Sequence, residues 1–273
     1  MLPIAVQFYS VRENSEKDFY GTLKKIKEMG YEGVEFAGLY GHSPEEVRDM
    51  CKEIGITPVS AHVSIEEITE NIPEVVKAYK TIGCEYIAIP YLVEDKRPGG
   101  ENFDKTIETI KVIGEECKKN GITLLYHNHD FEFIKIDGEY GLDILYKKVS
   151  ADLLKTELDT CWVNVGGENP SEFVLKYSGR APVVHLKDFV MKGKEKPKKL
   201  YELIGIEDNE ESADEEEFSF KPIGYGVQDI PSIIDAAEKA GANWLVVEQD
   251  SPDKGNTPLN AVKMSIDYLN SLK

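Results

Sequence analysis

The sequence predicts an α/β protein that folds as a single (β/α)8 barrel, or TIM barrel, over residues 1–273. Three observations lead to this prediction. A helix–glycine–strand phrase recurs along the chain, eight apolar strand patterns alternate with helical ones, and no hairpin signal joins consecutive strands. This alternation is typical of βα units in a parallel sheet, and a chain of 273 residues is long enough for one barrel or for two small domains.

The recurring phrase consists of a helical pattern, a glycine near its end and a short apolar run. The glycine suits the left-handed backbone position that closes a helix. The β-branched and aromatic residues that follow suit a buried parallel strand. The phrase appears as "IKEMGYEGVEF", "CKEIGITPVSAH", "YKTIGCEYIAIP", "CKKNGITLLYHNH" and "AEKAGANWLVVEQ".

The predicted strands are Ile4–Phe8, Gly33–Phe36, Pro58–His62, Tyr86–Pro90, Thr123–Tyr126, Thr156–Leu158, Pro182–Leu186 and Trp244–Val247. Helical patterns fall between them, for example at Glu16–Met29, Pro44–Ile54, Asn102–Lys119 and Ile230–Ala240, and a last helix is expected at about Leu259–Leu272. The runner-up architecture is a doubly wound sheet. It would need a phosphate-binding glycine loop after the first strand, where this chain has "QFYSVREN" instead.

The composition is that of a soluble globular protein, with 41% hydrophobic and 30% charged residues. No apolar run approaches the roughly 18 residues needed to cross a bilayer, so no membrane partner is expected. The N-terminal "MLPIAVQFYSVREN" lacks a basic region and a cleavage site, and we interpret it as a first strand rather than a signal peptide. Widely spaced cysteines without a CxxC pair indicate buried free thiols and a cytoplasmic location. They are Cys51, Cys84, Cys117 and Cys161.

The formal net charge of −18 is partly concentrated in one segment. The run "EDNEESADEEE" (Glu207–Glu217) contains eight acids and no base, which leaves −10 of the total of −18 on the rest of the chain. Because this charge repels phosphate backbones, a nucleic-acid partner is disfavoured. The lysine-rich "MKGKEKPKK" (Met191–Lys199) precedes the acidic run, and together they predict a charged surface excursion at about 191–217.

Polar residues gather at the carboxyl ends of the predicted strands, where the active sites of (β/α)8 barrels lie. Four of the five histidines end a strand, and acids end four of the eight strands. The residues at these ends are Gln7 and Tyr9, Glu35, His62, Pro90 and Tyr91, His127 to Glu132, Asp159, His185 with Lys187, and Glu248 with Gln249. Randomly scattered polar residues would fall more often on helix faces, so this clustering indicates that one mouth of the barrel performs chemistry.

Each of these positions also has a structural interpretation. Asp159 alone could simply cap the next helix, Glu35 fits a solvated loop, and a single histidine such as His62 is more often a satisfied structural residue than a ligand. Their joint occurrence favours chemistry, because Asp159, His185 and Glu248 would converge from adjacent strands. Three unpaired buried ionisable groups would be unfavourable, whereas a divalent cation would satisfy them together. A ligand set that mixes oxygen and imidazole suits Mn²⁺, Mg²⁺, Co²⁺ or Zn²⁺.

Several phrases along the chain resemble those of a known family. They are "AVQFYSVRE", "GYEGVEF", "LLYHNHDFEF", "ELDTCWV", "VVHLKDF", "FKPIGYGVQDIPSII" and "WLVVEQD", and they extend over essentially the whole chain. In this order and spacing they resemble the xylose-isomerase-like barrels of the sugar phosphate isomerase/epimerase superfamily. That superfamily includes ketose 3-epimerases, inosose dehydratases and, more distantly, endonuclease IV.

The resemblance implies one divalent metal, held by a strand-five Glu, a strand-six Asp, a strand-seven His and a strand-eight Glu. Asp159 of "ELDTCW", His185 of "VHLKD" and Glu248 of "VVEQD" match the last three positions.

Strand five departs from this pattern. Where the epimerases place glutamate, this chain has Tyr126, His127 and Asn128, and the nearest acid is Glu132, five residues beyond His127. Either Glu132 reaches back to complete the metal site, which we favour, or His127 or His129 supplies the fourth ligand.

The expected activity is that of a divalent-metal-dependent isomerase or epimerase of a sugar or related polyol. A carboxylate (Glu248 or Glu132) or a histidine (His127 or His129) would remove the proton next to a carbonyl. The metal and Lys187 would hold the resulting enediolate until it is reprotonated. The alternative is a metal-dependent lyase or dehydratase acting on an inosose or 3-keto-sugar. A displaced glutamate and added histidines suit removal of a proton on one face and protonation of a leaving hydroxyl.

The remaining expectations concern substrate and partners. Tyr9, Glu35 and His62 are expected to hydrogen-bond hydroxyl groups of a small carbohydrate. No nicotinamide, flavin or pyridoxal signature stands out, so the metal is the expected cofactor, and a homo-oligomer is compatible with the sequence. A nuclease like endonuclease IV would require three zinc ions and a basic face, which this acidic chain with five histidines does not suggest. A non-catalytic sugar-binding barrel would be expected to lose its metal ligands, whereas this chain keeps Asp159, His185 and Glu248.

Overall fold

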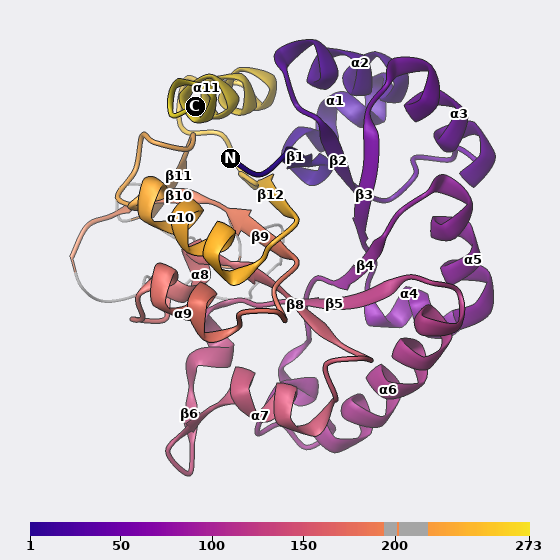
Figure 1. The fold of residues 1–273 in the computed structure, drawn as a ribbon, viewed down its shortest axis with the longest axis vertical. Coiled ribbons are helices and arrows are strands. Elements are labelled where there is room, and N and C mark those ends of the chain that lie inside the picture. The colour runs from indigo at the N-terminus through magenta and orange to yellow at the C-terminus, as the bar shows by residue number, and fades with distance from the viewer. Residues whose placement is uncertain (194–200, 202–217) are drawn as a thin grey trace.

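The computed structural model describes residues 1–193, 201 and 218–273, and its centre is a closed barrel of parallel strands (Figure 1). Each strand pairs with its neighbours in chain order, and the first strand pairs with the last to close the barrel. The strands are β1 Ile4–Gln7, β2 Gly33–Ala37, β3 Thr57–His62, β4 Tyr86–Ile89, β5 Thr123–His127, β8 Lys155–Asp159, β9 Val183–Leu186 and β12 Trp244–Val247. The predicted (β/α)8 barrel is therefore confirmed, with strand bounds close to those expected.

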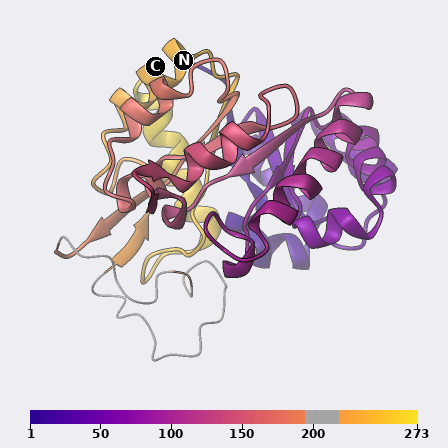
Figure 2. The ribbon, with the colours of Figure 1, turned by 90° about the horizontal axis from the view of Figure 1, so that it is seen from below.

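Helices cover the outside of the barrel, and the two chain ends lie side by side on one edge (Figures 1 and 2). The helices are α1 Arg12–Lys17, α2 Phe19–Met29, α3 Pro44–Ile54, α4 Ile65–Glu70, α5 Ile72–Ile82, α6 Phe103–Lys119, α7 Gly141–Lys148, α8 Thr160–Val165, α9 Pro170–Lys176, α10 Ile230–Ala240 and α11 Pro258–Ser271, with short 3-10 turns η1 Phe8–Val11, η2 Glu94–Lys96 and η3 Asp130–Phe133. None of the helices in the described ranges is long and apolar enough to span a bilayer.

One predicted helix is divided in two. The pattern at Glu16–Met29 becomes α1 and α2, because Asp18 ends the first helix and its carboxylate accepts a hydrogen bond from the Gly21 amide at 2.9 Å as the cap of the second. The glycines of the recurring phrase adopt the predicted left-handed conformation at helix ends. Five glycines that follow helices have φ values between 67° and 110°, the left-handed region that closes a helix: Gly30, Gly55, Gly83, Gly121 and Gly241.

Among the described residues, two small antiparallel two-stranded sheets add to the barrel, although the sequence predicted parallel strands alone. Strands β6 Lys135–Ile136 and β7 Glu139–Tyr140 pair after β5, and β10 Asp188–Met191 pairs with β11 Phe218–Lys221 after β9. Both follow the carboxyl ends of barrel strands. The predicted charged excursion at about 191–217 lies outside the described residues, apart from 191–193 and 201.

The barrel interior changes from apolar to polar along the strands. Alternate residues of a strand point to the same face, so residues two apart share the inside of the barrel. The apolar layer inside consists of Ala5, Val59, Tyr86, Ala88, Leu125, Val183 and Val246. Two residues further along four of these strands stand Gln7, His127, His185 and Glu248. The same alternation that builds the core therefore delivers polar side chains to the barrel mouth.

At the amino-terminal end of the barrel strands, one arginine links several backbone segments by hydrogen bonds. Arg180, just before β9, donates hydrogen bonds to the backbone carbonyls of Tyr146 at 2.9 Å, Val149 at 2.7 Å and Leu154 at 3.0 Å. These carbonyls belong to the end of α7 and the turn that leads into β8. The planar guanidinium can reach all three acceptors at once because its donors form a fixed fork.

We expect Arg180→Ala to lower the free energy of unfolding by about 2–4 kcal/mol, because it leaves several partly buried carbonyls without a donor. Urea denaturation followed by circular dichroism measures the change. Arg180→Lys should recover only part of it, since an ammonium lacks the fork. Lys111→Ala, which removes an exposed ion pair with Glu108, serves as the control and should change stability by less than about 0.5 kcal/mol. A loss for Arg180→Ala no larger than that of the control would contradict this role.

Candidate functional site

A cavity of about 420 Å³ opens at the carboxyl ends of the barrel strands. Its walls are formed by residues at or just after strand ends, together with one residue of α4. They are Tyr9, Ala37, Gly38, His62, Glu67, Pro90, Tyr91, His127, His129, Lys187, Glu248 and Asp250. The clustering of polar residues predicted at one mouth of the barrel is thus present in the structure.

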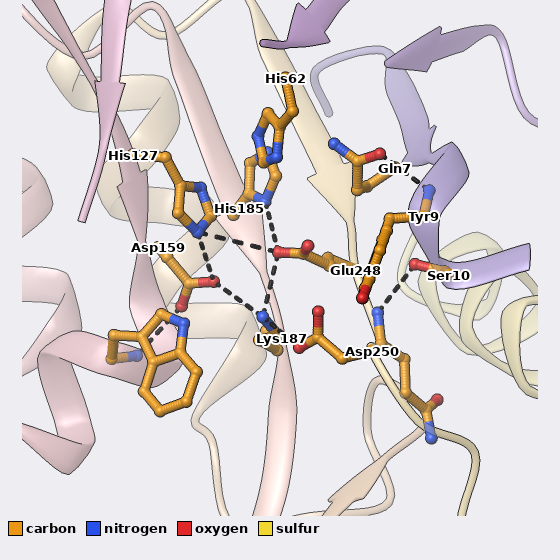
Figure 3. A network of polar contacts seen from close by, with 12 residues as sticks. Gln7, Tyr9, Ser10, His62, His127, Asp159, His185, Lys187, Glu248 and Asp250 are labelled. Carbon is orange, nitrogen blue, oxygen red and sulfur yellow. Dashed lines mark hydrogen bonds and ion pairs between the residues drawn. The ribbon is translucent and has the colours of Figure 1, made fainter. Parts of the chain in front are cut away.

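Four side chains beside this cavity converge on one point (Figure 3). His127, Asp159, His185 and Glu248 each offer a ligand atom, and these atoms lie within 4.8 Å of one another. His185 Nδ1 is 3.0 Å from Glu248 Oε2, and His127 Nε2 is 3.7 Å from Asp159 Oδ2 and 4.0 Å from Glu248 Oε2. Ligand atoms about 2.0–2.2 Å from an ion stand about 3.0–3.5 Å apart, so small movements would let this group hold a divalent cation. We call these four residues the outer group.

Asp159 has two functions that divide between its oxygens. Oδ1 accepts a hydrogen bond from the Trp162 amide at 3.0 Å and so caps α8, as its structural interpretation predicted. Oδ2 faces the outer group and is buried with no hydrogen-bond partner. Burial and nearby Glu248 raise the pKa of Asp159, and Lys187 lowers it in part, so that it stands at about 6. A buried carboxylate oxygen that accepts no hydrogen bond is suited to bind a cation.

Lys187 is a buried cation beside the outer group. Its Nζ lies 2.6 Å from Asp250 Oδ2, 3.1 Å from Glu248 Oε2 and 3.6 Å from Asp159 Oδ2. Burial by itself would lower the pKa of Lys187, but Asp250 and Glu248 outweigh it and hold that pKa well above its usual value. In turn, burial would raise the pKa of Glu248, whereas Lys187 and His185 hold it well below the ordinary range. Lys187 is therefore a charged donor, and Glu248 is an ionised carboxylate.

Two further acids lie deeper in the barrel, below the outer group. Glu35 Oε1 accepts a hydrogen bond from Gln7 Nε2 at 2.7 Å and lies 2.9 Å from His185 Nε2. Glu157 Oε1 lies 2.5 Å from His62 Nε2. Burial lowers the pKa of His62, but Glu35 and Glu157 more than reverse this and raise it to about 10. His62, His127, Glu157 and His185 form a second cluster of potential ligand atoms, which we call the inner group.

His129 belongs to an aromatic wall of the cavity. Its ring stacks on Phe131 with 5.3 Å between centroids and lies 5.2 Å from the ring of Trp162. Burial holds the pKa of His129 well below its usual value, and Lys187 lowers it further, so the imidazole is neutral. Its Nδ1 is buried without a hydrogen-bond partner. A neutral ring at the cavity wall with a free nitrogen can exchange a hydrogen bond or a proton with a bound molecule.

Glu132, the strand-five ligand favoured from sequence, lies away from the outer group. It is fully buried, one carboxylate oxygen accepts a hydrogen bond from the Tyr126 hydroxyl, and the other accepts one from the His129 amide at 2.8 Å. These contacts make Glu132 a cap of η3, and neither the inner nor the outer group contains it. His127, the alternative named from sequence, stands at the end of β5 within the outer group.

Some of the other predicted site residues line the cavity, and one does not. Tyr9 and His62 line the cavity with His129, Lys187 and Glu248, whereas Glu35 is fully buried and does not face it. Sequence reasoning missed Glu157, Asp250 and Asn128. Glu157 and Asp250 stand two residues before Asp159 and two after Glu248, so the period of two could have placed them on the same inner face. Asn128 accepts from the Asp159 amide at 3.0 Å, a contact between strands that no sequence pattern signals.

Comparison with known proteins agrees with the barrel fold. Residues 23–272 match a family model described as xylose isomerase-like TIM barrel. Among curated proteins, the inosose dehydratase of Geobacillus kaustophilus is 21% identical over 92% of this chain and 86% of its own length. Among solved structures, a sugar phosphate isomerase/epimerase from Parabacteroides distasonis superposes with a TM-score of 0.79 at 21% identity, covering 99% of this chain and 94% of that one. The IOLI protein, whose structure contains a zinc atom, gives a TM-score of 0.74 at 16% identity over 99% of this chain and 98% of its own.

We expect Asp159→Asn to weaken divalent-cation binding by more than about 100-fold, because it removes the charge of Oδ2 while an amide oxygen can still cap α8. Isothermal titration of chelator-treated protein with Mn²⁺ and Zn²⁺ measures the affinity. Glu67→Gln is the matched control, since Glu67 lines the same cavity outside both groups. Equal affinities in Asp159→Asn and wild type would place the metal elsewhere.

We also expect Glu132→Gln to stabilise the protein at alkaline pH relative to wild type. Burial raises the pKa of Glu132 to about 8, from an ordinary value of 4.5, and the hydrogen bonds from Tyr126 and His129 reverse this only in part. Because the folded-state pKa is the higher one, the stability from the protonated carboxyl is complete below about pH 4.5 and is lost as the pH rises through about 8.

The wild-type free energy of unfolding should therefore fall relative to that of Glu132→Gln between about pH 5 and about pH 8, by a few kcal/mol at about 1.4 kcal/mol per pKa unit. Urea titrations of both proteins across this range measure the difference. A difference that does not change with pH would mean that Glu132 is ionised in the fold, as a metal ligand would be.

Proposed function

The chain belongs to the xylose isomerase-like TIM barrel family, and from this premise we propose that it is a divalent-metal-dependent enzyme that removes a proton next to a carbonyl group of a sugar or related polyol. The observation that supports this most directly is the outer group, with the cavity on one side and, on the other, the buried Asp159 Oδ2, which accepts no hydrogen bond and lies 3.6 Å from Lys187 Nζ.

The metal would be held by His127, Asp159, His185 and Glu248, so His127 takes the position that the family resemblance gives to glutamate. Two carboxylates and two imidazoles suit Mn²⁺, Mg²⁺, Co²⁺ or Zn²⁺. When bound, such an ion supplies Lewis acidity, which polarises a carbonyl and acidifies the adjacent C–H bond.

The chain's own residues would handle the proton and the charge. Glu248 is ionised and faces the cavity, so it is the proposed base for the α-proton. The ammonium of Lys187, 3.1 Å from Glu248, would stabilise the negative charge that develops on the enediolate. Tyr9 and His62 line the cavity and remain candidates for binding substrate hydroxyls, whereas buried Glu35 acts on the substrate only through His62.

The first candidate for the overall reaction is isomerisation or epimerisation, in which the enediolate takes a proton back at the neighbouring carbon or on the other face. His129 supports this reaction, because a neutral imidazole lines the cavity on the β5 wall while Glu248 stands on the β12 wall. Two proton-exchanging groups on separate walls are the requirement for returning a proton from another direction.

Dehydration is the second candidate, and the Lys187–Glu248 pair favours it. A carboxylate that takes the α-proton and an ammonium that gives a proton to the β-hydroxyl lie on the same side of the cavity, so water would leave as the carbon–carbon double bond forms. The curated relative from Geobacillus kaustophilus is named an inosose dehydratase.

We expect the Mn²⁺-loaded protein to act on at least one member of a panel of ketoses, keto-glycosides and inososes in D₂O. Mass spectrometry and proton NMR follow the products. Deuterium at carbon without loss of water identifies an isomerase or epimerase, and loss of a hydroxyl identifies a dehydratase. Asp159→Asn is the negative control and should lower either activity by at least about 1,000-fold. No exchange with any carbonyl compound in the metal-loaded wild type would contradict the proposal.

A further inference from the structure

Glu157 is a fully buried acid in the middle of β8, and the outer group does not include it. It stands two residues before Asp159, so both side chains point into the barrel, with Glu157 one layer deeper. In the strand register Glu157 is opposite His127 on β5, and Asp159 is opposite His185 on β9. Glu157 therefore lies beside His127 and one layer below His185.

A single oxygen of Glu157 contacts three imidazole rings. Oε1 lies 2.5 Å from His62 Nε2, 3.1 Å from His127 Nδ1 and 3.1 Å from His185 Nε2. A carboxylate only accepts hydrogen bonds, so His62 Nε2 and His127 Nδ1, which are hydrogen-bonded to it, carry protons.

For His127 this contact decides which nitrogen is free. With the proton on Nδ1, bound to Glu157, the lone pair lies on Nε2. Nε2 is the atom that faces Asp159 Oδ2 at 3.7 Å and Glu248 Oε2 at 4.0 Å.

His185 is arranged in the opposite sense. Its Nε2 lies between two acids, 2.9 Å from Glu35 Oε1 and 3.1 Å from Glu157 Oε1, without the alignment of a hydrogen bond to either. Two negative charges on that side favour a proton on Nε2. Nδ1 faces the outer group and is hydrogen-bonded to Glu248 Oε2 at 3.0 Å, so carboxylates on both sides of the ring fix its orientation.

The inner group fits this supporting role better than it fits a second metal site. The separation of 2.5 Å between Glu157 Oε1 and His62 Nε2 is a hydrogen-bond distance. Two ligand atoms of one ion would stand about 3.0–3.5 Å apart. The contact between Glu157 Oε1 and His62 Nε2 therefore has the geometry of a hydrogen bond rather than that of two ligands of one ion.

We propose that Glu157 is a positioning residue for the metal centre, which fixes His127 and His185 so that Nε2 of the first and Nδ1 of the second face the ion. This inference rests on the proposed metal-dependent function and deepens it. Acceptors behind metal-bound histidines commonly set the tautomer and the orientation of the ring, and their removal lowers metal affinity about 10- to 100-fold.

The first test uses ¹⁵N-labelled, metal-free protein and long-range ¹H–¹⁵N correlation spectra, which separate Nδ1–H from Nε2–H imidazoles. Wild-type His127 should be the Nδ1–H tautomer. In Glu157→Gln the Nε2–H form should become populated, because the remaining charges, Asp159 and Glu248, then lie on that side of the ring. Glu35→Gln is the matched control: it removes the other buried acid, which contacts His62 and His185 but not His127, and should leave the His127 tautomer unchanged.

The second test measures Zn²⁺ and Mn²⁺ affinity by titration calorimetry, and Glu157→Gln should bind about 10- to 100-fold more weakly than wild type. Wild-type His127 protonated on Nε2 would overturn the proposal, and so would a folded Glu157→Gln with the wild-type tautomer and affinity. If Glu157→Gln does not fold, the spectra of wild type and Glu35→Gln decide. A wild type that binds neither ion contradicts the metal-dependent function, and the tautomer comparison still decides for or against Glu157.

Discussion

Burying a carboxylate is unfavourable by several kcal/mol unless a positive charge or donor compensates it, and this barrel buries five of them close together. They are Glu35, Glu157, Asp159, Glu248 and Asp250. Lys187 and the imidazoles of His62 and His185 compensate most of this charge, but Asp159 Oδ2 keeps no donor. The remaining excess of negative charge would attract a divalent cation to the mouth of the barrel.

The fold and the neighbourhood of the site could be predicted from the sequence because both depend on periodicity. Strands with apolar residues on both faces, followed by glycine-closed helices, leave few alternatives to a barrel. Once strands are parallel, their carboxyl ends meet, so Asp159, His185 and Glu248 had to come together. The distances in the outer group agree with that reasoning. The alternation of side chains along a strand could also have predicted Glu157 and Asp250, because each stands two residues from a predicted ligand, Asp159 or Glu248.

Depth and loop conformation could not be predicted in the same way. Glu35 ends its strand like a substrate-binding residue, but its partners, Gln7 and His185, lie deeper in the barrel, and only their packing shows that it is buried. Glu132 follows a strand whose end is at the site. Its direction is set by η3, which turns the carboxylate back to Tyr126 and the His129 amide. A 3-10 turn of this kind depends on local hydrogen bonds rather than on a repeating pattern.

His127, at the end of β5, changes the charge of the proposed ligand set and so bears on the reaction. In the ligand set implied by the family resemblance, three carboxylates and one imidazole would surround the ion with three negative charges. In the proposed site, His127 in that position would leave two carboxylates, Asp159 and Glu248, which would balance a divalent cation. An ion with less negative charge around it is a stronger Lewis acid toward a carbonyl. The same exchange removes a carboxylate base from the β5 wall and leaves Glu248 beside the ammonium of Lys187. A site of this kind suits a reaction in which one group takes the proton and a different group gives one back.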